Sequence, residues 1–344
     1  MLKLNNLKNY LRLNDWYDSK VPMMVAAFLF FVISDNSYLL QTIGGIKSFV
    51  MCFICYFLFI FMCLAFGYLT NDFSDIETDK LAGKDKIISK ISKKYVYISL
   101  LLLFLCGNLP ILLLTNFNIL MILLIIIVYF MGAAYSIKLF RFKEKGVMGL
   151  IISSVAQKCL PLISIPLIIN INPLTFLLWF LLMFINGLRY IIIHQICDLE
   201  NDRKTGITTF VSSFVSSKGT SYKKYIFLLI VFEIALVLLI LLPHLNLYLT
   251  ALSTFIFMYT CWEIFTIYVV NKFMQMSCFT TFYMVPLEDL YNIYLPQFFG
   301  IIMCLQNPLF LILVIVIFFY TLQNFKSKMS FIVKFSKIKI LKQE

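Results

Sequence analysis

The chain has 344 residues, of which 61% are hydrophobic and only 13% are charged, and its formal net charge is +12. Soluble domains are about half apolar and about a quarter charged, so this composition excludes an ordinary soluble protein. The apolar runs are continuous rather than alternating, which predicts an all-α integral membrane protein. Because no nucleic-acid-binding motif accompanies the positive charge, we expect no nucleic-acid partner.

The polar and basic segment 1–20 lacks the short apolar core and small-residue cleavage site of a signal peptide. We expect it to lie at the membrane interface. Turn-forming residues then separate about nine apolar runs, which we expect to form one transmembrane domain over 21–322. The expected spans are 21–40, 46–69, 95–115, 117–136, 147–170, 173–196, 224–243, 246–270 and 297–322.

The loops after the second, fourth and sixth expected spans are long and basic, and the short connections carry only Lys47. Positive charge stays on the cytoplasmic side of a membrane. This predicts a multi-pass protein of the cell (inner) membrane with a cytoplasmic N-terminus and three cytoplasmic loops. The basic tail 323–344 should rest on a membrane surface. Nine spans would place this tail outside. An extra crossing near 282–296, an error in one span, and tolerance of late positive charges all stay open.

An acidic stretch, NDFSDIETDK from Asn71, ends the second expected span. Residues three or four apart share one face of a helix. Asn71, Asp75 and Asp79 therefore align at i, i+4 and i+8, and Asp72 precedes Asp75 by three positions. The stretch can aim several side-chain oxygens at one point.

A second acidic stretch, DLENDRKTG, ends the sixth expected span and places Asp198 and Asp202 at i and i+4. Carboxylates brought close together repel unless a cation lies between them. Hard oxygen ligands suit Mg²⁺, which usually bridges carboxylates to substrate phosphates. A solvated acidic helix end would explain either stretch alone, but two such stretches on one side of the membrane favour a metal site.

Four basic residues lie on the same expected side, and positive-inside topology accounts for any single one of them. Arg neutralises phosphate through a planar fork and Lys as a point charge. The candidates for this role are Lys84, Lys86, Arg141 and Lys143.

Two ionisable residues, Arg189 and His194, lie on the sixth expected span ahead of the second acidic stretch. His194 is four residues before Asp198 and so shares its face. Ionisable residues within a membrane are functional candidates by default, which makes both of them candidate diphosphate-binding residues. The alternatives are a hydrogen-bonded core histidine and, for Arg189, an ion pair with Glu233 or Glu263.

Several segments resemble motifs of the UbiA superfamily of intramembrane prenyltransferases, in that family's order. NDFSDIETD resembles its NDxxDxxxD motif, and DLEND resembles its DxxxD motif. YSIKLFRFKEKG, from Tyr135, is similar to the YSxPPLKLKxxG loop of chlorophyll-synthase-like members, and GKDKIISKIS resembles a degenerate NRPLxSGxIS. Lys138 and Leu139 replace the paired prolines and Lys86-Ile87 replaces Arg-Pro, departures that bear on loop geometry and acceptor choice more than on the metal site.

The resemblance implies about nine helices around a central cavity, capped by cytoplasmic loops that bear the acidic motifs. It implies transfer of a polyprenyl group from its diphosphate to an aromatic or other lipid-soluble acceptor, with Mg²⁺ as the cofactor and membrane lipids as surroundings. Diphosphate leaves readily only if its growing charge is neutralised, which Mg²⁺ with Arg or Lys achieves in a water-poor site.

The resemblance also assigns roles to residues of this sequence. One metal ion with the diphosphate would be held by Asn71, Asp72, Asp75 and Asp79, and a second by Asp198 and Asp202. Tyr135, Arg141 and Lys143 would lie near the diphosphate or the forming cation. The candidate catalytic residues are Asp72, Asp75, Asp198, Tyr135 and Lys143.

Two other functions stay open at this point. Arg12, Trp16 and Lys20 form an R…W…K opening similar to that of UbiA relatives that transfer phosphoribose from phosphoribosyl diphosphate to a polyprenyl phosphate. The acidic motifs do not separate that reaction from prenyl transfer. The third possibility is a non-enzymatic cation transporter, although its carboxylates should lie near the bilayer midplane rather than at helix ends.

Overall fold

The computed structural model describes residues 4–81, 83, 86–206, 208–218, 222–241 and 289–320. Every regular element in these ranges is a helix, which confirms the expected all-α class. Six of the helices are long and apolar enough to cross a membrane. They cover Asp15–Asp35, Ile43–Ser74, Lys93–Leu114, Ile119–Ser136, Val147–Leu167 and Pro173–Ile196.

The first six expected spans correspond to these six helices, with shifted ends. The largest shift is at the first helix, α2 (Leu13–Asp35), which begins well before residue 21 because the polar segment ahead of it is also helical. Pro22 lies inside α2 and removes one backbone hydrogen bond without ending the helix. A short 3-10 helix, η1 (Ser37–Leu40), completes the expected first span.

Of the seventh and eighth expected spans, only the seventh lies largely within the described residues. The seventh corresponds to α11 (Tyr222–Leu241). The eighth, 246–270, and the basic tail 323–344 lie outside the described residues.

The expected ninth span, 297–322, is wrong as a single helix. α14 (Leu295–Gln306) ends at Asn307, whose backbone is extended, and a second apolar helix covers Pro308–Tyr320. The Asn307 side chain accepts a hydrogen bond from the backbone N of Leu309 at 3.1 Å and so caps the second helix. Pro308 has no amide hydrogen with which to continue the first.

The chain forms two compact units, Met1–Tyr17 with Ile46–Leu242 and Asp18–Gly45 with Pro243–Glu344. Both acidic motifs belong to the first unit. In the second unit, Phe30 of α2 packs edge-on against Phe299 of α14, with ring centroids 5.6 Å apart. The remaining short elements of this unit are a π-helix, η8 (Leu290–Tyr294), and a 3-10 helix, η9 (Pro308–Phe310).

Three apolar helices of the first unit pack against one another: α3 (Ile43–Ser74), α5 (Lys93–Leu114) and α6 (Ile119–Ser136). The Tyr129 ring on α6 lies 4.6 Å from that of Phe66 on α3 and 4.8 Å from that of Phe104 on α5. A Cβ atom at Gly107 of α5 would come within 2.6 Å of Met62 on α3. Glycine therefore permits the close approach of α5 to α3.

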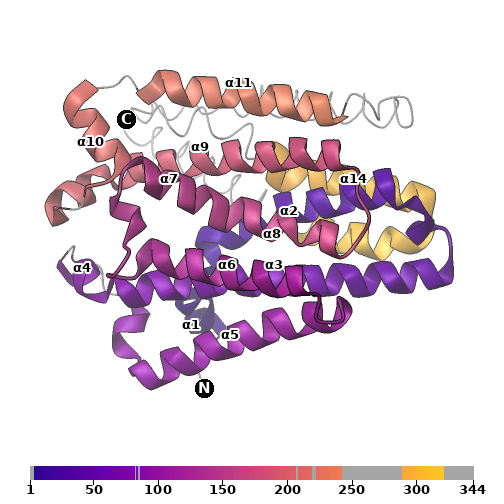
Figure 1. Cartoon of the computed structure of the whole chain (residues 1–344), viewed down its shortest axis with the longest axis horizontal. Helices are drawn as coiled ribbons and strands as arrows, with labels where there is room; N and C mark the ends of the chain where they lie inside the picture. The colour runs from indigo at the N-terminus through magenta and orange to yellow at the C-terminus, as the bar shows by residue number, and fades with distance from the viewer. Residues whose placement is uncertain are drawn as a thin grey trace, which may run out of the picture. The chain divides into compact units, whose positions relative to one another are not determined.

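The long helix α9 (Pro173–Thr205) runs between α7 and α11, as Figure 1 shows. A Cβ atom at Gly187 would overlap Ser154 of α7, so α9 and α7 are in close contact there. The span that contains α7 is continuous but mixed: α7 (Val147–Ser154), the π-helix η4 (Val155–Cys159), α8 (Leu160–Ile163) and the 3-10 helix η5 (Ile165–Leu167).

Short elements of the first unit surround the ends of α3, α6 and α9. One of them, α1, packs on the 3-10 helix η2 through a buried cluster of Tyr10, Ile88, Leu69 and Val96. These elements are α1 (Leu4–Tyr10), α4 (Ile76–Leu81), η2 (Ile87–Lys90), η3 (Phe142–Glu144) and α10 (Phe210–Lys218).

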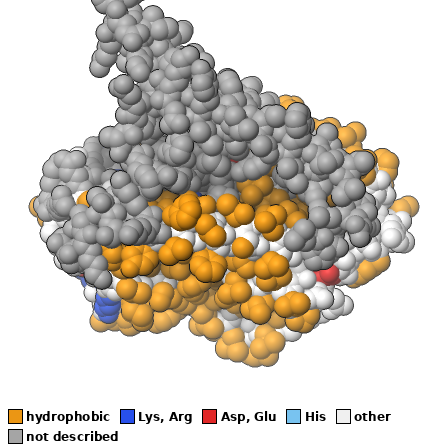
Figure 2. Space-filling model, turned by 90° about the horizontal axis from the view of Figure 1, so that it is seen from above, with side chains coloured by type: hydrophobic (Ala, Val, Ile, Leu, Met, Phe, Trp, Pro, Cys, Tyr) orange, Lys and Arg blue, Asp and Glu red, His pale blue; other side chains and the backbone are white. Residues whose placement is uncertain are grey.

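Hydrophobic side chains cover most of the described surface in Figure 2. On α11, Phe227 and Phe232 are more than half exposed, and so is Ile126 on α6. Outward-facing apolar side chains along helices of this length suit lipid rather than water. The chain is therefore built as a multi-pass membrane protein.

Candidate active site

The first acidic motif, residues 71–79, lies where α3 passes into α4. Helical hydrogen bonding continues across this junction: the backbone N of Asp75 donates to Asn71 O at 3.0 Å, and that of Asp79 donates to Asp75 O at 2.8 Å. The expected helical spacing of these residues is therefore present. Asp72 and Asp75 are both buried, so charged partners are needed to offset the loss of hydration.

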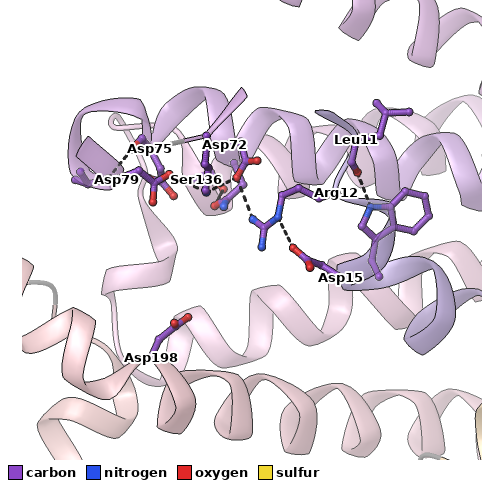
Figure 3. Close-up of polar contacts among 12 residues, drawn as sticks. Leu11, Arg12, Asp15, Asp72, Asp75, Asp79, Ser136 and Asp198 are labelled. Atoms are coloured by element: carbon purple, nitrogen blue, oxygen red, sulfur yellow. Dashed lines mark hydrogen bonds and ion pairs between the residues drawn. The ribbon is translucent and has the colours of Figure 1, made fainter. Parts of the chain in front are cut away.

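Two basic side chains from distant segments contact the same oxygen of Asp72. Arg12 Nη1 donates to Asp72 Oδ1 at 3.0 Å, and Lys86 Nζ donates to it at 2.6 Å. Lys86 also lies 2.7 Å from Asp79 Oδ2 and so bridges two carboxylates of the first motif. On its other side, Arg12 donates from Nε to Asp15 at 2.6 Å (Figure 3).

The backbone of Arg12 has a φ of +50°, a left-handed conformation that is uncommon for residues other than glycine. Arg12 forms the turn between α1 and α2, and this turn aims its guanidinium back at α3 (Figure 3). The guanidinium carbon also lies 5.2 Å from the centroid of the Tyr68 ring, within cation–π range. A strained backbone at a side chain with three partners is typical of a functional position.

The acidic partners hold both of these basic groups in the charged form. Burial alone would lower the pKa of Lys86, but the charge of Asp72, the hydrogen bond to Asp72 and the contact with Asp79 outweigh burial and leave this pKa raised. For Arg12, burial likewise lowers the pKa, and the charges of Asp72 and Asp15 outweigh it and raise the pKa overall. Both groups therefore stay positively charged beside the first motif.

The end of α6 and the loop after it supply two further contacts. Lys143 in η3 pairs through Nζ with Asp75 Oδ1, and both side chains are nearly buried. Ser136 at the end of α6 donates from Oγ to the Asn71 side-chain oxygen at 2.8 Å. Three separate segments thus hold the side chains of the first motif in place.

Tyr135, the residue before Ser136, lies at the end of α6 that adjoins the first motif. The charges of Asp75 in the first motif and of Asp202 in the second both act on its hydroxyl. Ser153 of α7 also interacts with this hydroxyl, and its Oγ accepts a hydrogen bond from Gln157 of the adjacent π-helix at 2.8 Å.

The second acidic motif, residues 198–202, lies on the last turns of α9, beyond the part of that helix that is apolar enough to span a membrane. His194 Nδ1 lies 2.9 Å from Asp198 Oδ2, as the expected shared helix face requires. Thr209 donates from its hydroxyl to Asp202 Oδ2 at 3.3 Å. Figure 3 shows the Asp198 side chain directed toward the side on which the first motif lies.

Two other predicted site residues have partners of their own. Arg141 pairs with Glu144 in its own turn, at 2.5 Å. Arg189 is fully buried and forms a two-pronged ion pair with Glu233 of α11, with Nε–Oε1 at 2.6 Å and Nη2–Oε2 at 3.1 Å. Of the two roles expected for Arg189, this geometry favours the ion pair.

Aromatic side chains lie beside the basic cluster. Trp16 stacks on Tyr68, with ring centroids 6.1 Å apart, and packs edge-on against Phe61 at 5.0 Å. The Trp16 indole N–H donates to Leu11 O at 2.8 Å, which fixes the ring against the turn that carries Arg12. Aromatic faces therefore adjoin the charged groups of the site.

The sequence pattern identified most of these residues but missed several that contact them. Lys84, one of the predicted diphosphate-binding residues, lies outside the described residues. Arg12 was noted only for a resemblance at the N-terminus, and Ser136 and Ser153 carry no signal in a single sequence. Each of these three reaches the site from another segment, and only the tertiary structure reveals such a contact.

The class of protein follows from comparison with known families. The UbiA prenyltransferase family model matches residues 26–284. The chain belongs to the UbiA prenyltransferase family, as its motifs indicated. No curated protein matches it by sequence.

Solved structures show the same fold at low sequence identity. A UbiA homologue from Archaeoglobus fulgidus bound to DMAPP and Mg²⁺ is 16% identical, with a TM-score of 0.55, over 86% of this chain and 99% of that one. A structure of an A. fulgidus UbiA homologue bound to GPP and Mg²⁺ is also 16% identical, with a TM-score of 0.55, over 90% and 99%. A digeranylgeranylglyceryl phosphate synthase is 17% identical, with a TM-score of 0.53, over 86% and 100%.

The donor chemistry of the site fits a divalent cation that shares its ligands with a substrate. Within the ranges that the structure describes, no three His, Cys, Asp or Glu side chains are grouped to hold a metal ion by themselves. Mg²⁺ does not require such a cage, because it binds through one or two carboxylates, waters and substrate phosphates. The ammonium of Lys86 already lies between oxygens of Asp72 and Asp79, which shows that these carboxylates converge on a positive charge.

Proposed function

We propose that this chain transfers a polyprenyl group from a polyprenyl diphosphate to a nucleophilic acceptor, at a Mg²⁺-dependent site formed by both acidic motifs. The observation that carries the proposal is the convergence of Asp72 and Asp79 on the ammonium of Lys86, at 2.6 and 2.7 Å. The Asp198 side chain is directed toward the same side (Figure 3). Carboxylates that converge on one positive charge can also converge on Mg²⁺. Bound Mg²⁺ would neutralise negative charge on the diphosphate as it leaves.

In this proposal, the basic side chains bind the diphosphate. Lys143, Lys86 and Arg12 would donate charge-assisted hydrogen bonds to its oxygens, and they are already positioned by the carboxylates. Donors that lie in the site before the substrate arrives stabilise the charge that develops on the leaving oxygen at a small cost in reorganisation. Asn71, Asp72, Asp75 and Asp79 would provide oxygen ligands on one side, and Asp198 and Asp202 on the other.

Cleavage of the bond between the first prenyl carbon and oxygen leaves an allylic cation, and the acceptor then forms a bond to that carbon and loses a proton. Aromatic side chains beside the site would stabilise positive charge, as the ring of Tyr68 does for the Arg12 guanidinium at 5.2 Å. The apolar helices that carry the site would exclude water, which would otherwise capture the cation. We assign no acceptor on this basis, although an aromatic compound or a lipid fits an apolar site.

A second reaction, phosphoribosyl transfer to a polyprenyl phosphate, gains support from the N-terminal contacts. Arg12 reaches the first acidic motif, and Trp16 packs beside it, which brings two residues of the R…W…K opening to the site. The same metal and diphosphate chemistry would serve either donor. Family membership gives no support to a cation transporter.

The test is an assay of the purified chain in detergent or lipid, with Mg²⁺ and a panel of acceptors. Geranylgeranyl diphosphate and phosphoribosyl diphosphate are offered in parallel, and diphosphate release and product mass are measured. Release from the prenyl donor supports the proposal and begins to identify the acceptor. Release only from the ribosyl donor, in the presence of a polyprenyl phosphate, selects the second reaction.

The proposal includes the orientation of the chain in the membrane. We expect the ends of α3 and α9 that bear the acidic motifs to face the cytoplasm, where soluble diphosphates and Mg²⁺ are available. Labelling a single cysteine placed at exposed Leu139 with an impermeant reagent, in intact cells and in inverted vesicles, tests this. Reaction only in inverted vesicles is the expected result.

A further inference from the structure

The first acidic motif is already matched in charge by the chain itself. Each of its three aspartates contacts a basic side chain, and these side chains come from segments far apart in the sequence. Arg12 lies between α1 and α2, Lys86 precedes η2, and Lys143 belongs to η3. Three positive charges therefore face three negative charges before any ligand binds.

Lys86 differs from the other two because it occupies the point at which two carboxylates of the first motif converge. Its Nζ lies 2.6 Å from Asp72 Oδ1 and 2.7 Å from Asp79 Oδ2. A divalent cation bound to the same oxygens cannot share that place with an ammonium group, since the two positive charges would repel strongly at such a separation. Arg12 already contacts one of these oxygens, which adds to the repulsion.

We propose that Lys86 is a displaceable counter-ion that makes the site take up a metal–diphosphate complex in preference to the free divalent cation. This inference rests on the proposed function. A free divalent cation would displace the ammonium and leave it without an anion nearby. With diphosphate present, the displaced ammonium gains phosphate oxygens as new partners, because the diphosphate brings more negative charge than one divalent cation neutralises.

The surroundings of Lys86 permit its side chain to move while its backbone stays in place. Its carbonyl oxygen accepts hydrogen bonds from Ser89 N at 3.1 Å and from Ser89 Oγ at 2.8 Å. The following segment is anchored by Ile88, which is buried against Tyr10 of α1. The side chain of Lys86 is 27% exposed and has a flexible stem. A change of partner therefore requires only rotation of the side chain.

The test measures metal binding directly, without turnover. Full-length protein in lipid nanodiscs is dialysed to equilibrium against Mn²⁺, which accepts the same oxygen ligands as Mg²⁺, and protein-bound Mn²⁺ is measured with and without inorganic diphosphate. For the natural chain, diphosphate should tighten Mn²⁺ binding by about 100-fold, within the usual range of coupling between ligands. Lys86→Met should bind Mn²⁺ alone about tenfold more tightly and lose most of this coupling.

The matched control is Lys138→Met, which removes a positive charge from an exposed pair with Glu77. It should behave like the natural chain, because neither side chain contacts the first motif's aspartates in the structure. Lys86→Gln serves as a second variant that keeps a hydrogen-bonding group, and the elution volume of each variant on size exclusion reports folding.

Three outcomes are distinguishable. If the natural chain bound Mn²⁺ as tightly without diphosphate as with it, the inference would be overturned and the proposed function would stay intact. Equal coupling in the natural chain and both Lys86 variants would also overturn it. An absence of bound Mn²⁺ under all conditions, in the natural chain and in both Lys86 variants, would contradict the metal site itself and, with it, the proposed function.

Discussion

The two acidic motifs have similar sequences but are held in different ways. The first motif has buried aspartates, and its partners come from α1–α2, η2, α6 and η3. The second lies on one continuous helix, where Asp198 contacts His194 four residues earlier and Asp202 contacts Thr209 seven residues later. The contacts of the first motif thus come from tertiary structure, and these two contacts of the second motif are local.

We therefore expect the two acidic motifs to contribute differently to the site. Buried carboxylates with fixed basic partners form a preorganised site, because their geometry is set before a ligand arrives. The carboxylates of the second motif are only partly buried, so they lose less hydration and can adjust at lower cost. We therefore expect substitutions at the first motif to have larger effects than equivalent substitutions at the second.

The largest expected effect is that of Asp72→Asn. The substitution removes the charge that holds Arg12 and Lys86, and with it a proposed metal ligand, so kcat/KM for diphosphate release should fall about 1,000-fold. Asp198→Asn should lower it less. Glu77→Gln is the matched control in the same stretch, since Glu77 is exposed and pairs only with Lys138 among the contacts described here. Equal losses in all three variants would remove the distinction between the motifs.

Arg189 tests whether the buried part of α9 serves folding or substrate. Arg189→Met leaves Glu233 buried without its charged partner and should lower the free energy of unfolding by about 3–5 kcal/mol. Adding Glu233→Met should restore much of that loss. Unfolding in mixed micelles is the measurement. A stable Arg189→Met protein that no longer binds inorganic diphosphate would instead assign Arg189 to the substrate.

Tyr135→Phe tests the link between the motifs. Loss of a hydroxyl that interacts with charged groups costs about 1.5 kcal/mol, which corresponds to about a tenfold fall in kcat. Tyr129→Phe is the control, because Tyr129 lies on the same helix among Phe66 and Phe104. If Tyr135→Phe retained full activity and Tyr129→Phe did not, the proposed position of the reaction would be wrong.

The smallest expected effect is that of His194→Gln. The His194 side chain is 49% exposed, and its contact with Asp198 is an exposed pair of the kind that contributes little. Activity should change by no more than about threefold. A loss as large as that of Asp72→Asn would show that the second motif is as strongly preorganised as the first.

The sequence predicted what depends on local chemistry. Apolar runs predicted the first six spans, and helical periodicity predicted that Asn71, Asp75 and Asp79 share a face, as the backbone hydrogen bonds confirm. The spacing of His194 and Asp198 likewise predicted their contact. In each case the relevant neighbours lie within two turns of one helix.

The sequence could not predict what depends on distant segments. Arg12 reaches Asp72 across 60 positions of the chain, and Ser136 reaches Asn71 across 65. The ninth expected span was wrong because hydropathy does not detect a break at which Asn307 and Pro308 end one helix and start another. A single sequence carries no measure of such pairings.

The most direct test of the central claim, that both acidic motifs serve one prenyl diphosphate site, is a double-mutant cycle with Asp75→Asn and Asp202→Asn. Residues that act as a unit have strongly non-additive effects on catalysis. With geranylgeranyl diphosphate as donor, kcat/KM of the double variant should lie within about threefold of the more damaged single variant. Losses that multiply, as for independent sites, would contradict the account.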